Sequence, residues 1–337
     1  MTISTVRIGV VGLGAFGETR VAALSGLVGV EVGAVCSRRV ERAAEVASHS
    51  GVPRCYTDWE ELARDPLLDA VVVATAEHEH LRPALATIQA GKHLLVEKPL
   101  ATSSAEARRI ASAAMSAGVI LMPGHTVRFE TRYALLKEHL SSGALGEVVT
   151  VQARRNRARK AMQPYLRLHP VFETVVHDLD VALWYVGRRV ESVVGWQRSV
   201  QGAENPDLVW LALQFEGGVL GLRQTHWLVP DQAGVPIDDA FEVVGSRGLA
   251  RLELTDRGLY YWDERGNHVP DVAYEPRLRS TVGGAVREEL SYFTRCVRDG
   301  RQTTLVPVDE AVHGIEVAGA ALHACQTGQP IRVAEHG

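Results

Sequence analysis

The sequence predicts an α/β protein in which a doubly wound parallel sheet precedes an α+β domain with a large, open, mostly antiparallel sheet. Residues 1–124 alternate short apolar runs with longer helical stretches, and repeated strand–helix units form parallel sheets covered on both faces. After Gly124, apolar runs with a period of two dominate, which indicates a sheet with two different faces. We therefore expect two domains, residues 1–124 and residues 125–337, with the C-terminal helix able to pack back on the first.

The first domain is expected to consist of strands joined by helices. The expected strands are Val6–Val11, Val30–Val35, Ala70–Ala74, Leu94–Val96 and Val119–Met122. The expected helices are Glu18–Val28, Arg39–Ser50, Leu81–Ala90 and Ser103–Ala117. Because crossovers between parallel strands are right-handed, these helices fall on both faces of the sheet.

The second domain is expected to begin with a helix at Arg128–Leu140 and to continue mainly as strands. The expected strands are Val148–Ala153, Val190–Trp196, Leu208–Phe215, Val219–Trp227, Phe241–Val244 and Leu249–Leu254. Two further helices are expected at Ala285–Arg298 and Asp309–Thr327. Gly217 and Gly218 separate two strand runs and predict a hairpin turn.

This second sheet offers more apolar surface than its few helices can cover. Trp210 and Trp227 lie on its expected strands and add to that surface. Because exposed apolar sheet generally marks an interface, we expect a homo-oligomer, either a homodimer or a homotetramer.

Composition points to an ordinary globular enzyme. The chain has 337 residues, 46% of them hydrophobic and 23% charged, with a formal net charge of −4. That charge gives no general attraction to nucleic acid or to an anionic membrane, and no apolar run approaches the roughly 20 residues that span a bilayer. The four cysteines are scattered without a C-x-x-C pair, which favours reduced thiols and a cytoplasmic location over zinc or disulfide frameworks.

A glycine-rich turn follows the first expected strand. The residues expected to line a dinucleotide there are Gly12, Gly14, Ala15, Phe16 and Gly17. In this G-x-G-x-x-G pattern Gly12 permits the tight turn, Gly14 lets the backbone approach a pyrophosphate, and Gly17 lets the helix pack on the strand. The helix N-terminus then offers N–H groups to phosphate. The alternative is a glycine turn without a ligand.

The second expected strand runs into Ser37, Arg38 and Arg39. Ser37 lies 20 residues beyond Gly17, where an NAD-binding fold usually has an acid that binds the ribose 2′-hydroxyl. Arginines would pair with a 2′-phosphate instead. We therefore expect NADP(H) to be preferred, with NAD(H) possible; the alternative is a solvated charge pair.

Two other strands end in polar residues. Thr75, Ala76 and His80 follow the strand at Ala70–Ala74, and Glu97-Lys98-Pro99 follows the strand at Leu94–Val96. Ligands bind beyond the carboxyl ends of parallel strands, so both segments are expected beside the cofactor.

The order of these motifs, together with Gly91-Lys92-His93, closely resembles the glucose–fructose oxidoreductase/inositol dehydrogenase (Gfo/Idh/MocA) family over nearly the whole chain. The resemblance implies an N-terminal Rossmann domain and a C-terminal α/β domain with a large open sheet. It also implies oxidation or reduction of a secondary alcohol or ketone on a sugar, sugar derivative or cyclitol with NAD(H) or NADP(H).

A stripe of polar residues in the second domain matches the family pattern D-x-x-x-H-x-x-D. At 100° per residue, Glu173, His177, Asp180 and Trp184 share one face of a helix. The resemblance implies that His177 and Lys98 are the proton-transfer pair, with Glu173 orienting His177. Glu173 replaces the family's usual Asp, and Ala76 with Glu77 replace its usual Pro and Asn, which leaves the substrate open. A zinc or iron site and a hydrogen-bonded structural face are the alternatives; no metal is expected.

The resemblance also places His125 near the nicotinamide. Arg128, Arg157, His169 and Asp180 complete the expected substrate-binding residues. The basic run Arg154–Lys160 either holds a phosphorylated or nucleotide-linked substrate or is a solvated loop.

The function expected from these residues is an NAD(P)-dependent oxidoreductase acting on a small carbohydrate-like substrate. A dinucleotide-binding redox sensor without turnover is the alternative from another class, but it would not need both Lys98 and His177. An NAD-assisted glycosidase is a third interpretation, for which no clear leaving-group acid is seen.

Overall fold

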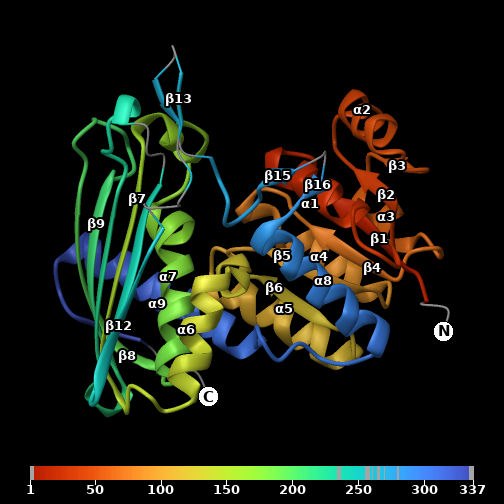
Figure 1. Cartoon of the computed structure of the whole chain (residues 1–337). Helices are drawn as coiled ribbons and strands as arrows, with labels where there is room; N and C mark the ends of the chain where they lie inside the picture. The colour runs from red at the N-terminus through yellow and green to blue at the C-terminus, as the bar shows by residue number, and fades with distance from the viewer. Residues whose placement is uncertain are drawn as a thin grey trace. The chain divides into compact units, whose positions relative to one another are not determined.

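The structure is a computed structural model that describes residues 4–233, 237–254, 259, 261–263, 266–268, 270–278 and 281–333 (Figure 1). The chain forms two compact units. The first unit is Met1–Glu130 with Ala273–Val312, and the second unit is Thr131–Val272 with His313–Gly337. These units are defined by compactness, which divides the chain after Glu130. The functional domain boundary expected after Gly124 stays a prediction.

The first unit contains a parallel sheet of six strands. These are β1 (Val6–Val11), β2 (Val30–Cys36), β3 (Cys55–Tyr56), β4 (Ala70–Val73), β5 (His93–Glu97) and β6 (Leu121–Gly124). Their order is β3-β2-β1-β4-β5-β6, and every pairing is parallel. The order reverses between β1 and β4, which is where doubly wound sheets bind their ligands. The predicted doubly wound sheet is confirmed.

Helices connect these strands. They are α1 (Ala15–Ser25), α2 (Val40–Ser50), α3 (Trp59–Arg64), α4 (Leu81–Gln89) and α5 (Ser104–Ala117), with short turns η1 (Glu77–Glu79) and η2 (Thr126–Phe129). A later segment adds β15 (Arg277–Leu278), β16 (Thr281–Val282) and α8 (Gly284–Asp299) to the same unit. The sequence does not predict β3 or α3, because neither a two-residue strand nor a six-residue helix shows a clear period.

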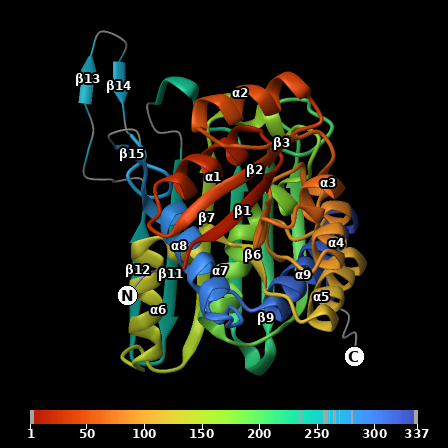
Figure 2. The same ribbon diagram turned by 90° about the vertical axis from the view of Figure 1, so that its right-hand side faces the viewer.

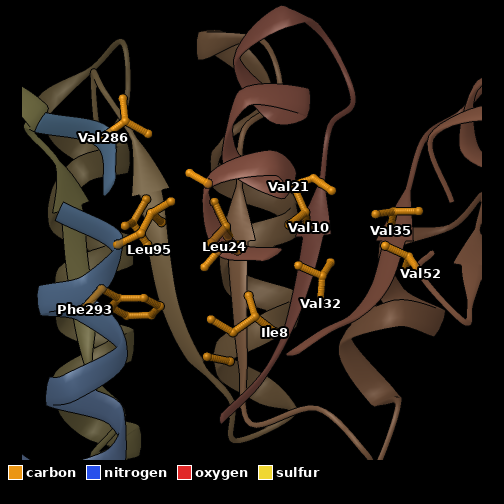
Figure 3. Packing of buried hydrophobic residues seen from close by; sticks show 14 of the residues in the cluster. Ile8, Val10, Val21, Leu24, Val32, Val35, Val52, Leu95, Val286 and Phe293 are labelled. Carbon is orange, nitrogen blue, oxygen red and sulfur yellow. The ribbon is translucent and has the colours of Figure 1, made fainter. Parts of the chain in front are cut away.

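Helix α1 packs against the sheet and against α8. Val21 and Leu24 of α1, Ile8 of β1 and Val286 and Phe293 of α8 belong to one buried apolar cluster (Figure 3). Such burial contributes roughly 1.5–3 kcal/mol for each large side chain. The helix that follows the glycine turn is therefore held firmly on both sides.

The second unit contains a seven-stranded sheet. Its strands are β7 (Val148–Arg157), β8 (Val190–Arg198), β9 (Leu208–Phe215), β10 (Leu220–His226), β11 (Ile237–Gly245), β12 (Gly248–Glu253) and β17 (Ile331–Arg332). The order is β12-β11-β7-β10-β9-β8-β17. Only β7 and β10 pair in parallel within this sheet. The predicted open, mostly antiparallel sheet is confirmed.

One face of this sheet carries helices. Figure 1 shows α6 (Thr131–Ser141), α7 (Val176–Val186) and α9 (Val308–Thr327) on that face. The shorter turns are η3 (Arg159–Tyr165), η4 (Val171–Val175), η5 (Glu216–Gly218) and η6 (Asp231–Ala233). A separate two-stranded ribbon is formed by β13 (Tyr261–Asp263) and β14 (Gly266–His268) (Figure 2).

The hairpin predicted at Gly217 and Gly218 is confirmed. It joins antiparallel β9 and β10, and the φ angles of the two glycines are 74° and 81°. Left-handed φ angles of this kind are costly for residues with a Cβ atom.

The other face of the sheet exposes tryptophans. Trp196 of β8 and Trp210 of β9 are register partners, with exposed fractions of 55% and 42%. Trp227 was also expected to add to the uncovered sheet surface, but that prediction is wrong. It is 3% exposed, because it lies just past the end of β10 and packs against the Tyr165 ring.

Candidate active site

The glycine turn of the first unit has the shape that a pyrophosphate requires. Gly12 has φ +94°, and a Cβ atom there would lie 2.4 Å from the Ala74 carbonyl oxygen. A Cβ atom on Gly17 would lie 1.9 Å from the Gly12 carbonyl oxygen, whereas at Gly14 none of the described atoms comes within 4 Å. Gly12 and Gly17 therefore allow the chain to turn tightly, and Gly14 leaves the outer side of the turn open.

Helix α1 presents its N-terminus at this opening. Gly14 is the N-cap residue and provides no side-chain cap, and Gly14, Ala15 and Phe16 are exposed. The first N–H groups of the helix and its positive dipole end are thus available to an anion. The buried Thr75 hydroxyl, just past β4, makes no hydrogen bond to any described residue. These features fit a dinucleotide pyrophosphate, and a nicotinamide dinucleotide supplies hydride chemistry when bound.

The end of β2 lies directly beside the glycine turn, since the Gly12 N–H donates to the Cys36 carbonyl. Ser37 is half-buried, and Arg38 and Arg39 are exposed. Arg38 Nη1 lies 2.9 Å from Glu79 Oε1, and the Arg38 side chain is 73% exposed. The end of β2 therefore carries exposed positive charge, and Glu79 offsets part of it.

His80 holds two loops of the first unit together. Its Nδ1 lies 2.8 Å from the Pro99 carbonyl oxygen, and its Nε2 lies 3.2 Å from the Thr75 carbonyl oxygen. Burial lowers the pKa of His80 below its usual value. Both ring nitrogens thus face backbone oxygens, so any effect of His80 on cofactor binding would act through the positions of these loops. Ala76, the N-cap of η1, lies in one of them.

Lys98 follows the last residue of β5 and is half-buried. The Lys98–Pro99 peptide bond is cis. Glu97, expected to contact the cofactor, is buried, and its Oε1 accepts a hydrogen bond from Arg20 Nε at 2.5 Å. Lys98 therefore follows a strand whose last side chain, that of Glu97, points into the interior of the unit.

The segment after β6 is buried as well. His125 and Arg128 are both nearly inaccessible. Arg128, expected to bind substrate, donates through Nη1 to the Leu305 carbonyl at 2.9 Å and through Nη2 to Glu310 Oε2 at 2.8 Å. In this structure its guanidinium thus binds other parts of the first unit.

In the second unit, His177 lies on a helix that begins with a π-helical turn. The segment η4 is π-helical, and α7 continues from Val176. The predicted straight stripe assumed α-helical geometry from Glu173 onward, and that assumption is wrong for Glu173, because i→i+5 bonding changes the angle between successive residues. Glu173 is buried and accepts a hydrogen bond from the Thr174 hydroxyl at 2.5 Å. His177 is half-buried, and Asp180 is buried.

Asp178, next to His177, fixes α7 to the sheet. Its carboxylate accepts hydrogen bonds from Arg155 Nε at 3.0 Å and Arg155 Nη2 at 2.8 Å, and it pairs with Arg223. Arg155 Nη1 also donates to Asp239 Oδ2 at 2.8 Å. All four side chains are buried. We call this set the Asp178 cluster; the sequence analysis missed it, although an aspartate in an apolar helix was the available signal.

The basic run Arg154–Lys160 is largely paired with carboxylates. Besides Arg155, Arg154 lies 2.9 Å from Asp238 Oδ1, and Arg157 pairs with Asp239. These arginines therefore already have anionic partners within the unit. A role for Arg157 in substrate binding stays a prediction.

His169 precedes η4 and also has two partners. Its Nδ1 accepts from the Val171 N–H at 3.2 Å, and its Nε2 lies 2.8 Å from Gln197 Oε1. Burial lowers the pKa of His169. The neutral ring with its proton on Nε2 satisfies both contacts.

The described part of the chain contains no group of three or more His, Cys, Asp or Glu side chains placed to hold a metal ion. Among the described helices, none is both long and apolar enough to cross a bilayer.

Two family models match the chain. The model for the oxidoreductase family with an NAD-binding Rossmann fold matches residues 6–125, and the GFO/IDH/MocA C-terminal domain matches residues 133–251. Fold and site together define a dehydrogenase that uses a nicotinamide dinucleotide and acts on CH–OH groups. The chain belongs to the GFO/IDH/MocA oxidoreductase family.

Its relatives include dehydrogenases named for inositol. The chain is 32% identical to inositol 2-dehydrogenase 2 of Saccharopolyspora erythraea, over 98% of this chain and 96% of the relative. It is 29% identical to the myo-inositol 2-dehydrogenase of Thermotoga maritima, over 88% and 89%. The scyllo-inositol dehydrogenase of Lactobacillus casei, solved with NAD(H) and scyllo-inositol, has the same fold, with a TM-score of 0.84, 17% identity and 98% and 100% coverage.

Proposed function

We propose that this protein transfers hydride between a nicotinamide cofactor and the carbon that bears a secondary hydroxyl in a cyclitol or a closely similar polyhydroxylated ring. The observation that carries the proposal is the full-length similarity to an inositol 2-dehydrogenase. The open side of Gly14 and the uncapped start of α1 support the cofactor half of the proposal.

Lys98, His177 and Glu173 are proposed to act on the reacting hydroxyl. In the oxidation direction, the hydroxyl proton passes to the imidazole of His177 while the carbon bearing the hydroxyl loses hydride. The Lys98 ammonium stabilises the negative charge that develops on the oxygen. Glu173, in the π-helical turn before His177, orients the imidazole. The proposal rests on the match between these residues and the motifs of the family.

A substrate panel tests this function. Myo-inositol, scyllo-inositol, free sugars, glycosides and sugar nucleotides should be incubated with NADP⁺ and with NAD⁺, and reduced nicotinamide followed by absorbance. We expect the highest kcat/KM with an inositol. Turnover of a glycoside to free sugar without a change in reduced nicotinamide would instead favour a glycosidase.

We also propose that NADP(H) binds more tightly than NAD(H), because Arg38 and Arg39 take the place of the usual ribose-binding acid. Each charge-assisted contact is worth about 1.5–3 kcal/mol, so Arg38→Ala should weaken NADP(H) binding by about 10- to 150-fold. Glu79→Gln should strengthen NADP(H) binding, since it releases Arg38 from its partner. NAD(H), which lacks the 2′-phosphate, serves as the internal control. Equal dissociation constants for the two cofactors in the unmutated protein would refute the preference.

We further propose that the helix-free face of the second unit's sheet mediates homo-oligomerisation. Trp196, Trp210, Leu220 and Leu222 are exposed on neighbouring strands. Light scattering at micromolar concentration should give the mass of a dimer or tetramer, and Trp210→Glu should shift it toward the monomer. Met115→Glu, at an exposed apolar residue of α5 in the first unit, is the control. A monomeric mass for the unmutated chain contradicts the proposal.

A further inference from the structure

We propose that Arg20 is a positioning residue for hydride transfer, which ties the phosphate-binding helix α1 to the strand end that carries Lys98 and to the turn that follows His125. The inference rests on the proposed dehydrogenase function. It concerns the first unit alone, because Arg20 and all its partners below belong to that unit.

Arg20 lies inside the first unit, on the second turn of α1. Its side chain has 0% exposure. Nε donates to Glu97 Oε1 at 2.5 Å, Nη1 lies 2.5 Å from Glu289 Oε2, and Nη2 donates to the Thr126 hydroxyl at 3.1 Å. Each guanidinium nitrogen therefore contacts a different chain segment: β5, α8 or η2.

The partners of Arg20 are also joined to one another. The Thr126 hydroxyl donates to Glu289 Oε2 at 2.8 Å. A Cβ atom on Gly124, the last residue of β6, would lie 3.0 Å from Glu97 Cα, so the ends of β5 and β6 pack closely. The planar guanidinium thus holds these groups in one fixed arrangement. A lysine ammonium is a compact point charge and could not contact all of them at once.

Three of the segments in this network, β5, η2 and α1, adjoin residues of the candidate active site, whereas α8 supplies Glu289 and braces them. Glu97 is bonded to Lys98 in the chain, and Thr126 is bonded to His125. Helix α1 begins at the pyrophosphate turn. By joining these segments, the guanidinium sets the position of Lys98 and His125 relative to the phosphates, and therefore relative to the nicotinamide ring at the other end of the cofactor.

The net charge of the network depends on whether Glu289 carries a proton. Arg20 faces two carboxylates, and the side chains of Glu97 and Glu289 have 8% and 0% exposure. Burial raises the pKa of Glu289 to about 7, and its Oε1 has no hydrogen-bond partner among the described residues. A protonated Glu289 leaves one cation and one carboxylate, an arrangement that a buried site tolerates.

The test uses Arg20→Lys, which keeps the charge but cannot contact all three segments. The first readout is the fluorescence of bound NADPH, which responds to the surroundings of the nicotinamide ring and needs no substrate. We expect the dissociation constant to stay close to that of the unmutated protein and the emission to change. The second readout is turnover: kcat should fall by about 10- to 100-fold, and the isotope effect with substrate deuterated at the reacting carbon should rise, because the hydride step becomes rate-limiting.

Two other variants separate positioning from loss of folding. Thr126→Val removes the hydroxyl that Arg20 Nη2 contacts and keeps the shape, so it should change emission in the same direction by less. Arg54→Lys alters another partly buried arginine of the first unit, which lies 2.7 Å from Asp65, and should leave emission and isotope effect unchanged.

A purely structural role lowers the active fraction but leaves the isotope effect and the emission per bound cofactor unchanged, and that result overturns the proposal. If no panel substrate turns over, the function fails while the emission still decides the role of Arg20.

Discussion

Replacing Lys98 by methionine or His177 by alanine is expected to lower turnover by about 10²–10⁴-fold, because each change removes a group proposed to transfer a proton or to stabilise charge at the reacting carbon. Lys98→Met keeps most of the side-chain volume and removes only the ammonium. The dissociation constant of the cofactor should change little, since the glycine turn and the start of α1 are untouched. Steady-state kinetics with the best panel substrate and a separate NADPH titration measure both quantities.

Each catalytic variant has a matched control in the chain. Lys92 precedes β5 as Lys98 follows it, and its ammonium donates to the Leu68 carbonyl at 2.6 Å, so Lys92→Met removes a lysine from the other end of the same strand. His139 is exposed on α6, so His139→Ala removes a histidine from the unit that contains His177. Both controls should retain near-normal kcat. Near-normal turnover by Lys98→Met and His177→Ala themselves would overturn the catalytic assignment.

The pH dependence separates the two catalytic roles. Without His177 the hydroxyl proton must pass to hydroxide, so the remaining activity of His177→Ala should rise more steeply with pH than that of the unmutated protein. Lys98→Met removes a group proposed to stabilise charge rather than to take the proton, so it should lower the rate without changing the shape of the pH profile. Identical pH profiles for the two variants would mean that the roles are not distinct.

What the sequence could predict here depended on short-range patterns. Gly12 and Gly17 were predictable because the G-x-G-x-x-G spacing directly follows an apolar strand run in the sequence. The hairpin at Gly217 and the parallel order of the first sheet follow from equally local signals.

The features that the sequence analysis missed depend on residues far apart in the chain. Arg20 contacts Glu97 and Glu289, and no local pattern links α1 to α8. Arg155 and Asp178 are on β7 and α7, and their pairing depends on how a helix crosses a sheet. The π-helical turn at Val171–Val175 changed the direction of Glu173, which a uniform rotation of 100° per residue cannot represent.

Asp178→Ala is expected to destabilise the second unit by about 3–5 kcal/mol, because removing one partner of a buried ion pair leaves the other charge uncompensated. Here it leaves both Arg155 and Arg223 without this acceptor. Burial already lowers the pKa of Arg223 to about 10, so loss of the Asp178 carboxylate disfavours its charged form further. Asp178→Asn should cost less, since its amide oxygen still accepts a hydrogen bond.

Urea unfolding followed by tryptophan fluorescence measures this cost. Trp184, Trp196, Trp210 and Trp227 lie in the second unit, so the signal follows that unit closely, and protein concentration must be fixed because association would add to stability. Arg251→Ala breaks an exposed pair with Glu242 in the same unit, with side-chain exposures of 61% and 23%, and such pairs contribute only about 0.2–1 kcal/mol. If Asp178→Ala lowered the free energy of unfolding no more than Arg251→Ala does, the Asp178 cluster would not anchor α7, and His177 would be held by apolar packing alone.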